Sequence, residues 1–377
     1  MLISGADVFL NGRFCHRDIL VQDGKIAELA KPGDIKETGE EVIFAEGKRI
    51  LPGLVDIHSH GRNGQDFSLA TEKDLTVLCK AYASCGVTAV LATMMTNRPE
   101  ILENSVDAAA QYIRKKVSCG AKLVGIHLEG PFLGKEKRGA HDEQYLRRPD
   151  KEWFAKLKKI SGNNIRLVTL DPRLEGAKEF IGFCRAEDCR VSLGHTACTY
   201  EEALTAAKAG ADHVTHLFNA MNSIHHREPG LIGAAWDAGM YTELICDGIH
   251  VHPALIRMLF AAHPEKVLLI SDSMPAAGLS DGAYELGGLP VYVKEGQARQ
   301  ADGTLAGSTI SLYDAMVNCI RFGIPAEAAV YSATYLPAKS VGLEHVVGSI
   351  DKGRTADFLV VSEEWQLEKV VINGACI

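Results

Sequence analysis

The chain has 377 residues, of which 46% are hydrophobic and 23% are charged, and its net charge is −8 with a pI near 6.0. This is the composition of an ordinary globular protein, and its length allows one large domain or two to three smaller ones. The acidic balance argues against a general nucleic-acid-binding protein, which would present a basic surface. Because the sequence holds neither a signal-peptide pattern nor an apolar run of about 18 residues, we expect no membrane segment.

Both ends of the chain predict short β-strands. Asn-Gly at Asn11 and Asp-Gly at Asp23 interrupt alternating apolar and polar residues within residues 1–50, which is typical of hairpins. Residues 345–377 show the same alternation, with another Asn-Gly turn at Asn373. Neither end is long enough to bury a core by itself. We therefore expect the two ends to fold together into one small β-sandwich domain.

The intervening residues 51–344 alternate between apolar strands and helices. The β-branched runs that predict strands are residues 54–60, 88–94, 123–130, 165–172, 191–196, 213–220, 243–249 and 267–273. Helical patterns separate most of them, at residues 72–86, 100–117, 175–189, 200–210 and 253–264. Eight strands alternating with helices predict a (β/α)8 barrel, with residues 287–307 as an added hairpin after the eighth strand. The alternative, a doubly wound open sheet, would need a glycine-rich phosphate turn after its first strand, and this sequence has none there.

The first expected barrel strand ends in two histidines. His58 and His60 are two residues apart, so on a strand they face the same side, roughly 6.6 Å apart. In a barrel both would point into the carboxyl-terminal mouth, where barrel enzymes have their active sites. The pattern is short, and taken alone it fits equally well with two histidines that merely end a strand.

Other strand ends carry metal-capable residues at the same level of the barrel, namely Glu129, His195, His216 and Asp272. A carboxylate in a setting as apolar as "GIHLEGPF" is costly to bury unless it is paired or coordinates a cation. Imidazole nitrogens with carboxylate oxygens form a typical zinc site, and the same set also suits iron, manganese or nickel. Their coincidence at one end of the barrel predicts a metal centre.

A series of motifs identifies a family. In chain order they read "PGLVDIHSHG", "GIHLEGPF", "SLGHT", "THLFNAM", "REPG", "DGIHV", "SDSM" and "GTLAGS". This series resembles the N-acetylglucosamine-6-phosphate deacetylases of the amidohydrolase superfamily, and the resemblance extends over nearly the whole chain. It implies a hydrolase of amino-sugar catabolism that removes the acetyl group from N-acetylglucosamine 6-phosphate, giving glucosamine 6-phosphate and acetate.

The resemblance makes Glu129, His195 and His216 the main metal ligands. It makes Asp272 the acid/base that hydrogen-bonds metal-bound water, accepts its proton and passes it to the departing amine. Family members without the HxH hold one metal, and those with it can hold two, so one or two divalent ions per subunit are expected, with zinc first. The second site would consist of His58, His60, Glu129 and Asp272.

The resemblance also implies substrate contacts. His141 would donate a hydrogen bond to the oxyanion. Arg227, whose planar fork suits phosphate oxygens, and His250 would reach the site of a neighbouring subunit, which implies a homodimer. The remaining expected substrate-binding positions are Ala140, Asn219, Ala220, Asp247, Gly248, Ile249, Leu305, Ala306 and Gly307. Because a phosphorylated sugar does not cross membranes unaided, a cytoplasmic enzyme is expected.

Enzymes with related activities are expected to show different residues at the strand ends. Dihydroorotases and hydantoinases usually carry a carboxylated lysine at the end of strand four, where this chain reads "VTLDPR". Adenosine-type deaminases would be expected to have a HxxE-like pattern after strand five, but no glutamate follows His195 before Glu201. A non-catalytic scaffold would be expected to have lost ligands or the aspartate. Deacetylation of N-acetylgalactosamine 6-phosphate, which differs by the configuration of one hydroxyl, stays open.

Overall fold

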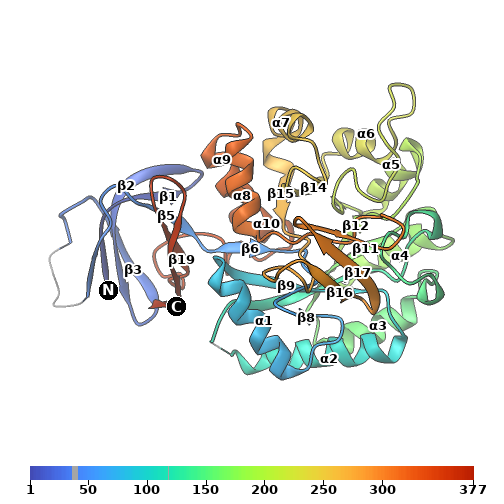
Figure 1. Cartoon of the computed structure of the whole chain (residues 1–377), viewed down its shortest axis with the longest axis horizontal. Helices are drawn as coiled ribbons and strands as arrows, with labels where there is room; N and C mark the ends of the chain where they lie inside the picture. The colour runs from blue at the N-terminus through green and yellow to red at the C-terminus, as the bar shows by residue number, and fades with distance from the viewer. Residues whose placement is uncertain (36–40, 118) are drawn as a thin grey trace.

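The computed structural model describes residues 1–35, 41–117 and 119–377. It consists of a barrel and a smaller β-sheet that lie side by side along the longest axis, with both chain termini in the smaller part (Figure 1). Residues 36–40 belong to the small domain expected from the sequence, and they lie outside the described residues. Within the described residues no helix is both long and apolar enough to cross a membrane.

The barrel is built from eight parallel strands in one sheet. They are β6 (Leu54–Asp56), β9 (Val87–Met95), β10 (Lys122–Glu129), β11 (Ile165–Leu170), β12 (Arg190–Leu193), β13 (His213–Val214), β14 (Tyr241–Ile245) and β15 (Val267–Ile270). Each strand pairs with the next one along the chain. Just beyond β6 and β15, Asp272 N–H donates to His58 O (3.0 Å) and His60 N–H donates to Ser273 O (2.8 Å), which joins the two ends of the sheet. The predicted (β/α)8 barrel is therefore confirmed.

Helices surround the barrel (Figure 1). They are α1 (Glu72–Ser84), α2 (Pro99–Lys115), α3 (Lys151–Ile160), α4 (Ala177–Ala186), α5 (Tyr200–Ala209), α6 (Gly230–Asp237), α7 (Pro253–Ala262), α8 (Leu312–Arg321), α9 (Ala326–Ala333) and α10 (Tyr335–Ser340), with short 3-10 turns at Lys135–Lys137, Glu143–Tyr145 and Pro264–Lys266. Thr71, Thr199 and Ser311 start α1, α5 and α8 through capping boxes, in which side chain and backbone satisfy each other's free donors. The five helices expected from the sequence are present.

Polar side chains form a hydrogen-bonded layer inside the barrel. His127 Nε2 lies 2.8 Å from Thr169 Oγ1, which is 2.8 Å from Thr215 Oγ1, and Ser192 Oγ lies 2.6 Å from that same oxygen. All four residues are fully buried. Because buried polar groups cost free energy unless they are paired, these hydrogen bonds allow the four polar side chains to lie inside an otherwise apolar barrel.

The two chain ends form one further sheet of eight strands. They are β1 (Leu2–Leu10), β2 (Arg13–Gln22), β3 (Lys25–Ala30), β4 (Val42–Phe44), β5 (Arg49–Pro52), β19 (Phe358–Val361), β20 (Leu367–Ile372) and β21 (Ala375–Cys376). The expected turns occur where predicted: Asn11, Asp23 and Asn373 have left-handed backbone, with φ of 50°, 50° and 52°. The sheet has its own core, which includes Ile3, Ile19, Ile50, Phe358 and Val371.

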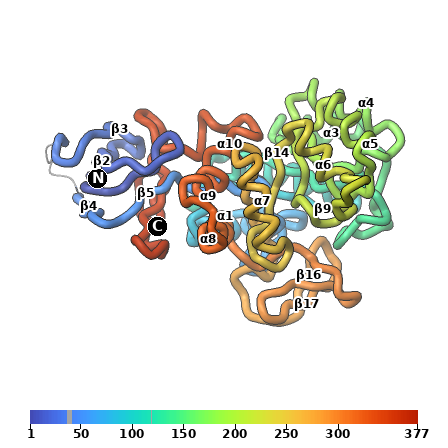
Figure 2. Tube along the Cα trace, turned by 90° about the horizontal axis from the view of Figure 1, so that it is seen from above, coloured from blue at the N-terminus to red at the C-terminus, as the bar shows by residue number. Residues whose placement is uncertain are grey.

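The expected excursion after the last barrel strand is a three-stranded antiparallel sheet of β16 (Gly282–Leu286), β17 (Leu289–Lys294) and β18 (Gln297–Arg299), and so begins before residue 287. It extends away from the barrel (Figure 2). After the first barrel strand, β7 (Gly61–Arg62) and β8 (Gln65–Asp66) form a two-stranded ribbon. Both excursions follow strand ends, which is where a barrel builds its active site.

Candidate active site

The expected ligands lie at the carboxyl ends of five barrel strands: His58 and His60 follow β6, Glu129 ends β10, His195 follows β12, His216 follows β13 and Asp272 follows β15. All six are buried, with exposed fractions of at most 6%. His195, His216 and Asp272 have left-handed backbone, with φ of 50°, 27° and 47°. This conformation costs non-glycine residues about 1–3 kcal/mol and concentrates at functional sites. Here it turns the chain at the strand end while the side chain stays in the barrel mouth.

Glu129, His195 and His216 form one group of donor atoms. Glu129 Oε1 lies 3.1 Å from His195 Nε2 and 3.0 Å from His216 Nε2, and the two nitrogens are 3.1 Å apart. Ligand atoms about 2.0–2.1 Å from a tetrahedral zinc ion lie about 3.3 Å from one another. The three atoms therefore have the spacing of one face of such a coordination sphere.

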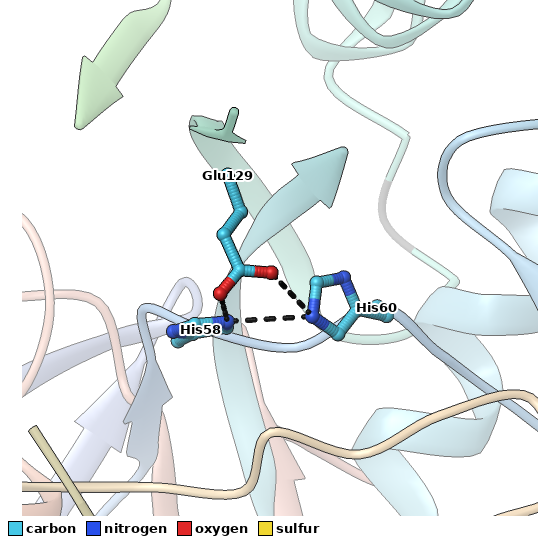
Figure 3. A group of neighbouring side chains, drawn as sticks. All are labelled: His58, His60 and Glu129. Atoms are coloured by element: carbon cyan, nitrogen blue, oxygen red, sulfur yellow. Dashed lines mark hydrogen bonds and ion pairs between the residues drawn. The ribbon is translucent and has the colours of Figure 1, made fainter. Parts of the chain in front are cut away.

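A second group adjoins the first through Glu129 (Figure 3). The Nε2 atoms of His58 and His60 are 3.4 Å apart. Glu129 Oε1 is 3.5 Å from His58 Nε2, and its other oxygen, Oε2, is 3.1 Å from His60 Nε2. Asp272 Oδ1 lies 3.4 Å from His58 Nε2 and 3.2 Å from His60 Nε2. Glu129 thus takes part in both groups, as a carboxylate that bridges two ions does.

The outer nitrogens of two histidines fix the orientation of their rings. His195 Nδ1 lies 2.9 Å from the backbone oxygen of Lys137, and His58 Nδ1 lies 2.8 Å from Glu243 Oε2. Since both partners are acceptors, Nδ1 carries the proton in each neutral ring, and the Nε2 lone pair faces the cluster. This is the usual arrangement of metal-bound histidine. The donor set, its spacing and its tautomers all fit a divalent metal.

The negative charges of the carboxylates in the cluster also favour the binding of a cation. Burial alone lowers the pKa of His60, but Asp272 and Glu129 outweigh it and raise that pKa to about 9. Burial likewise opposes the charged form of His58, whose pKa is nevertheless raised well above its usual value by the surrounding carboxylates, Glu129 first among them. The carboxylates thus favour positive charge at this place, and a bound divalent ion supplies it directly.

His141 presents a proton to the cluster. Its Nδ1 accepts from the backbone N–H of Thr96 (3.3 Å) and lies 2.9 Å from Thr96 Oγ1. Burial is the main cause that lowers the pKa of His141, to about 4, so the ring is neutral. With Nδ1 accepting, the single ring proton is on Nε2, which lies 3.3 Å from Glu129 Oε2. The geometry therefore provides a neutral N–H donor beside the donor atoms of the cluster.

A cavity of about 510 Å³ opens above the cluster. Of the expected site residues it is lined by His60, Glu129, Ala140, His141, His195, His216, Asn219, Ala220, His250, Asp272, Leu305 and Gly307. The sequence did not indicate the other lining residues. They are Met95 at the end of β9, Glu136, Lys137, Arg138 and Gly139 before Ala140, Leu286 and Arg299 in the β16–β18 excursion, and Gln300, Asp302 and Thr304 directly after it.

Some expected residues lie elsewhere. Arg227 is exposed and does not line the cavity, and its Nη1 lies 2.6 Å from His226 Nε2. Asp247 supports His250: its carboxylate accepts the backbone N–H groups of Ile249 and His250 (both 2.8 Å) and lies 2.6 Å from His250 Nδ1. His250 consequently lines the cavity of its own chain, whereas the resemblance placed it in a neighbour's site.

Gly248 and Ala306 do not line the cavity themselves but are neighbours in sequence of residues that belong to the site. Gly248 has φ of 76°, a conformation that favours glycine, within the loop that carries His250. Ala306 is buried at 1% exposure beside the lining residues Leu305 and Gly307.

Besides Lys137, sequence reasoning missed Thr96 and Glu243, which also hold expected site residues in place. Thr96 presents its backbone N–H to His141, and no side-chain pattern reveals a backbone donor. Glu243 is a fully buried glutamate within β14 that contacts His58. A signal for it existed, since a glutamate in the apolar run "ELIC" is expensive to bury without a partner.

The fold and the site define a hydrolase of the amidohydrolase class. The model of the amidohydrolase family matches residues 49–376, and the chain therefore belongs to this family. Among its relatives, the N-acetylglucosamine-6-phosphate deacetylase of Bacillus subtilis (strain 168) is 36% identical over 359 residues, which are 94% of this chain and 91% of the relative. The N-acetylgalactosamine-6-phosphate deacetylase of Escherichia coli O157:H7 is 33% identical over 357 residues, 94% of this chain and 93% of that protein.

Solved structures give the same picture. The N-acetylglucosamine-6-phosphate deacetylase from Pasteurella multocida superposes with a TM-score of 0.94 at 28% identity, covering 100% of this chain and 99% of that one. A mutant of the Mycobacterium smegmatis enzyme, in complex with N-acetyl-D-glucosamine-6-phosphate, superposes with a TM-score of 0.92 at 31% identity, covering 100% and 98%.

Proposed function

We propose that this chain hydrolyses the acetamide of N-acetylglucosamine 6-phosphate to glucosamine 6-phosphate and acetate. The observation that carries the proposal is the pair of donor groups that share Glu129 and open onto one cavity. The similarity over nearly the full length to deacetylases of this substrate supports the choice of sugar phosphate.

Each residue of the cluster has a task in the proposed reaction. Glu129, His195 and His216 would hold the first ion, and His58, His60, Glu129 and Asp272 the second. When bound there, a divalent ion lowers the pKa of water towards about 7 and polarises the acetamide carbonyl. Zinc is the ion that we propose, because imidazole and carboxylate donors at this spacing suit it.

Two residues would handle protons during acyl transfer. Asp272 takes the proton of the attacking water and delivers it to the amine nitrogen as the C–N bond breaks. His141 donates its Nε2–H to the carbonyl oxygen, on which negative charge develops in the tetrahedral state. The Thr96 backbone N–H keeps that proton on Nε2 throughout.

The phosphate end of the cavity would be completed by a second copy of the chain. Asn219, Ala220 and His250 line the cavity, and we propose that they bind the sugar phosphate together with Arg227 of the partner in a homodimer. Exposed apolar side chains lie on the helices and loops next to Arg227 and His250: Ile224 (56% exposed), Trp236 (44%), Ile249 (39%) and Met258 (64%). Their burial between two copies would stabilise such a dimer.

Two further proposals concern organisation and location. We propose that residues 1–50 with 345–377 form one domain and that residues 51–344 form the catalytic domain, because Ile3, Ile50 and Phe358 share a core separate from the main barrel cluster. We also propose a cytoplasmic location, since the substrate is a phosphate ester that does not cross membranes by itself.

Acetate release tests the function. Purified protein loaded with zinc is given N-acetylglucosamine 6-phosphate and, in parallel, N-acetylgalactosamine 6-phosphate, the substrate named for a relative of 33% identity. We expect acetate and glucosamine 6-phosphate in equal amounts, loss of activity in chelator and recovery on adding metal. Faster release from the galactosamine ester would make that sugar the substrate, and no release from either would contradict the proposal.

A further inference from the structure

Glu243 is a buried carboxylate that the proposed reaction does not use. It lies on β14 with an exposed fraction of 0%, beneath the ligand cluster, and it does not line the cavity. Its Oε2 accepts two hydrogen bonds: one from His58 Nδ1–H at 2.8 Å and one from the backbone N–H of His216 at 3.3 Å. A single carboxylate oxygen thus links residues that belong to the two groups of donor atoms.

The charge of Glu243 has little compensation inside the protein. Within the described part of the chain, its ion pair with His58 is the only one that it makes, and its Oε1 is buried without a hydrogen-bond partner. Breaking a buried charge pair by removing one partner is strongly destabilising. A buried carboxylate with so little compensation fits positive charge on the far side of the His58 ring, where Nε2 faces Glu129 and Asp272.

We infer that Glu243 is the positioning residue of the second metal ion. It holds the proton of His58 on Nδ1, which leaves the Nε2 lone pair free for the ion, and its charge makes that nitrogen a stronger ligand. The inference rests on the proposed function only in taking the cluster to be a metal centre. Its contact with His216 is to the backbone, so the first ion depends on Glu243 much less than the second.

Metal affinity separates this role from a structural one. The test measures zinc per subunit and the two dissociation constants by titration of metal-free protein, for the wild type, Glu243→Gln and Glu243→Leu. Partners of metal-bound histidines typically contribute about 10- to 100-fold to affinity. We expect two ions in the wild type, about tenfold weaker binding of the second ion in Glu243→Gln, and about 100-fold weaker binding in Glu243→Leu, with the first ion changed least. Gln keeps the volume and an acceptor for His58, so the charge alone accounts for its effect.

Ser192→Ala is the matched control. It removes a fully buried hydroxyl that bonds Thr215 inside the same barrel, and Ser192 contacts none of the expected ligands. We expect both affinities to stay at the wild-type values in this variant. Should Glu243→Leu fail to fold, Glu243→Gln still gives the answer.

Three outcomes would overturn the inference: a single ion in the saturated wild type, unchanged binding of the second ion in the Glu243 variants, or equal weakening of both ions. Acetate release by the wild type is scored separately. A protein that binds two ions as described but releases no acetate would end the proposed function and leave the role of Glu243 intact.

Discussion

The two ends of the cavity are built in different ways. At the metal end, six buried side chains from five strand ends lie within hydrogen-bond or ion-pair distance of one another, all in one chain. At the proposed phosphate end, Arg227 stands exposed on a loop and contacts His226 rather than the cavity. Strand ends are fixed by the barrel and can assemble a site by themselves. A loop at the surface needs something else to place it at such a cavity, and in the proposed homodimer the second copy does so.

Asp272→Asn should have the largest effect, because it removes the proposed acid/base and leaves the rest of the metal end in place. General acid–base catalysis contributes about 10²–10⁴-fold, and we expect kcat to fall towards the upper end of that range. The ion of Glu129, His195 and His216 should remain, which metal analysis of the same sample checks. A variant that loses both ions would make Asp272 an essential ligand of the whole centre instead.

His141→Ala should follow, with a fall in kcat of about 10²–10³-fold and little change in KM, since an oxyanion donor acts mainly in the transition state. Steady-state kinetics on zinc-loaded protein measures it. The exposed His345, whose side chain is 86% exposed, gives the control variant His345→Ala, with wild-type rates expected. A rise in KM at unchanged kcat would show that His141 binds substrate and takes no part in the chemistry.

Arg227→Ala should weaken the phosphate end alone. Hydrogen bonds to charged groups contribute about 1.5–3 kcal/mol, so kcat/KM for the phosphorylated sugar should fall about 10- to 100-fold, mainly through KM. Arg148→Ala, which removes an exposed arginine paired with Glu175, should have no effect. An unchanged KM in Arg227→Ala would remove this residue from the site.

Mixing variants tests whether Arg227 acts on its neighbour. In a mixture of Arg227→Ala and Asp272→Asn subunits, each mixed dimer would contain one site with both residues intact. If subunits exchange freely, about a quarter of all sites would be restored. If the mixture is no more active than the sum of the two separate variants, the proposal that Arg227 acts in the site of the neighbouring subunit is contradicted.

Met258→Asp should have an effect no larger than that of Arg227→Ala. A charge on this exposed apolar position of α7 should separate the proposed homodimer, as sedimentation velocity would show, and KM should rise while the zinc content stays constant. The matched control is Val77→Asp, at an exposed apolar position on α1. Separation into monomers without any change in KM would mean that each chain binds phosphate alone.

The barrel strands and the residues at their ends could be predicted from the sequence, whereas the positions of the loops could not. The eight barrel strands follow from β-branched runs, and Glu129, His195 and Asp272 come together because parallel strands end at one face of a barrel. Helix α6 was not predicted, since it is short and starts at Gly230 directly after Pro229, and Pro-Gly is typical of a turn.

The parts that could not be predicted depend on backbone geometry and on loops. The left-handed φ of His195, His216 and Asp272 carries no residue signature, because the surrounding fold imposes it on residues that do not favour it. The loop after β14 follows no periodic pattern either. The contact between Asp247 and His250 directs the His250 ring into the cavity of its own chain, and no sequence pattern predicts it.

The most direct measurement compares acetate release from N-acetylglucosamine 6-phosphate and from unphosphorylated N-acetylglucosamine by one zinc-loaded preparation. If the metal end and the phosphate end serve one substrate, kcat/KM should be far higher for the phosphate ester, and Arg227→Ala should erase most of that preference. Equal rates on the two sugars would leave the barrel and its metal centre in place and contradict the account of the cavity as a sugar-phosphate site.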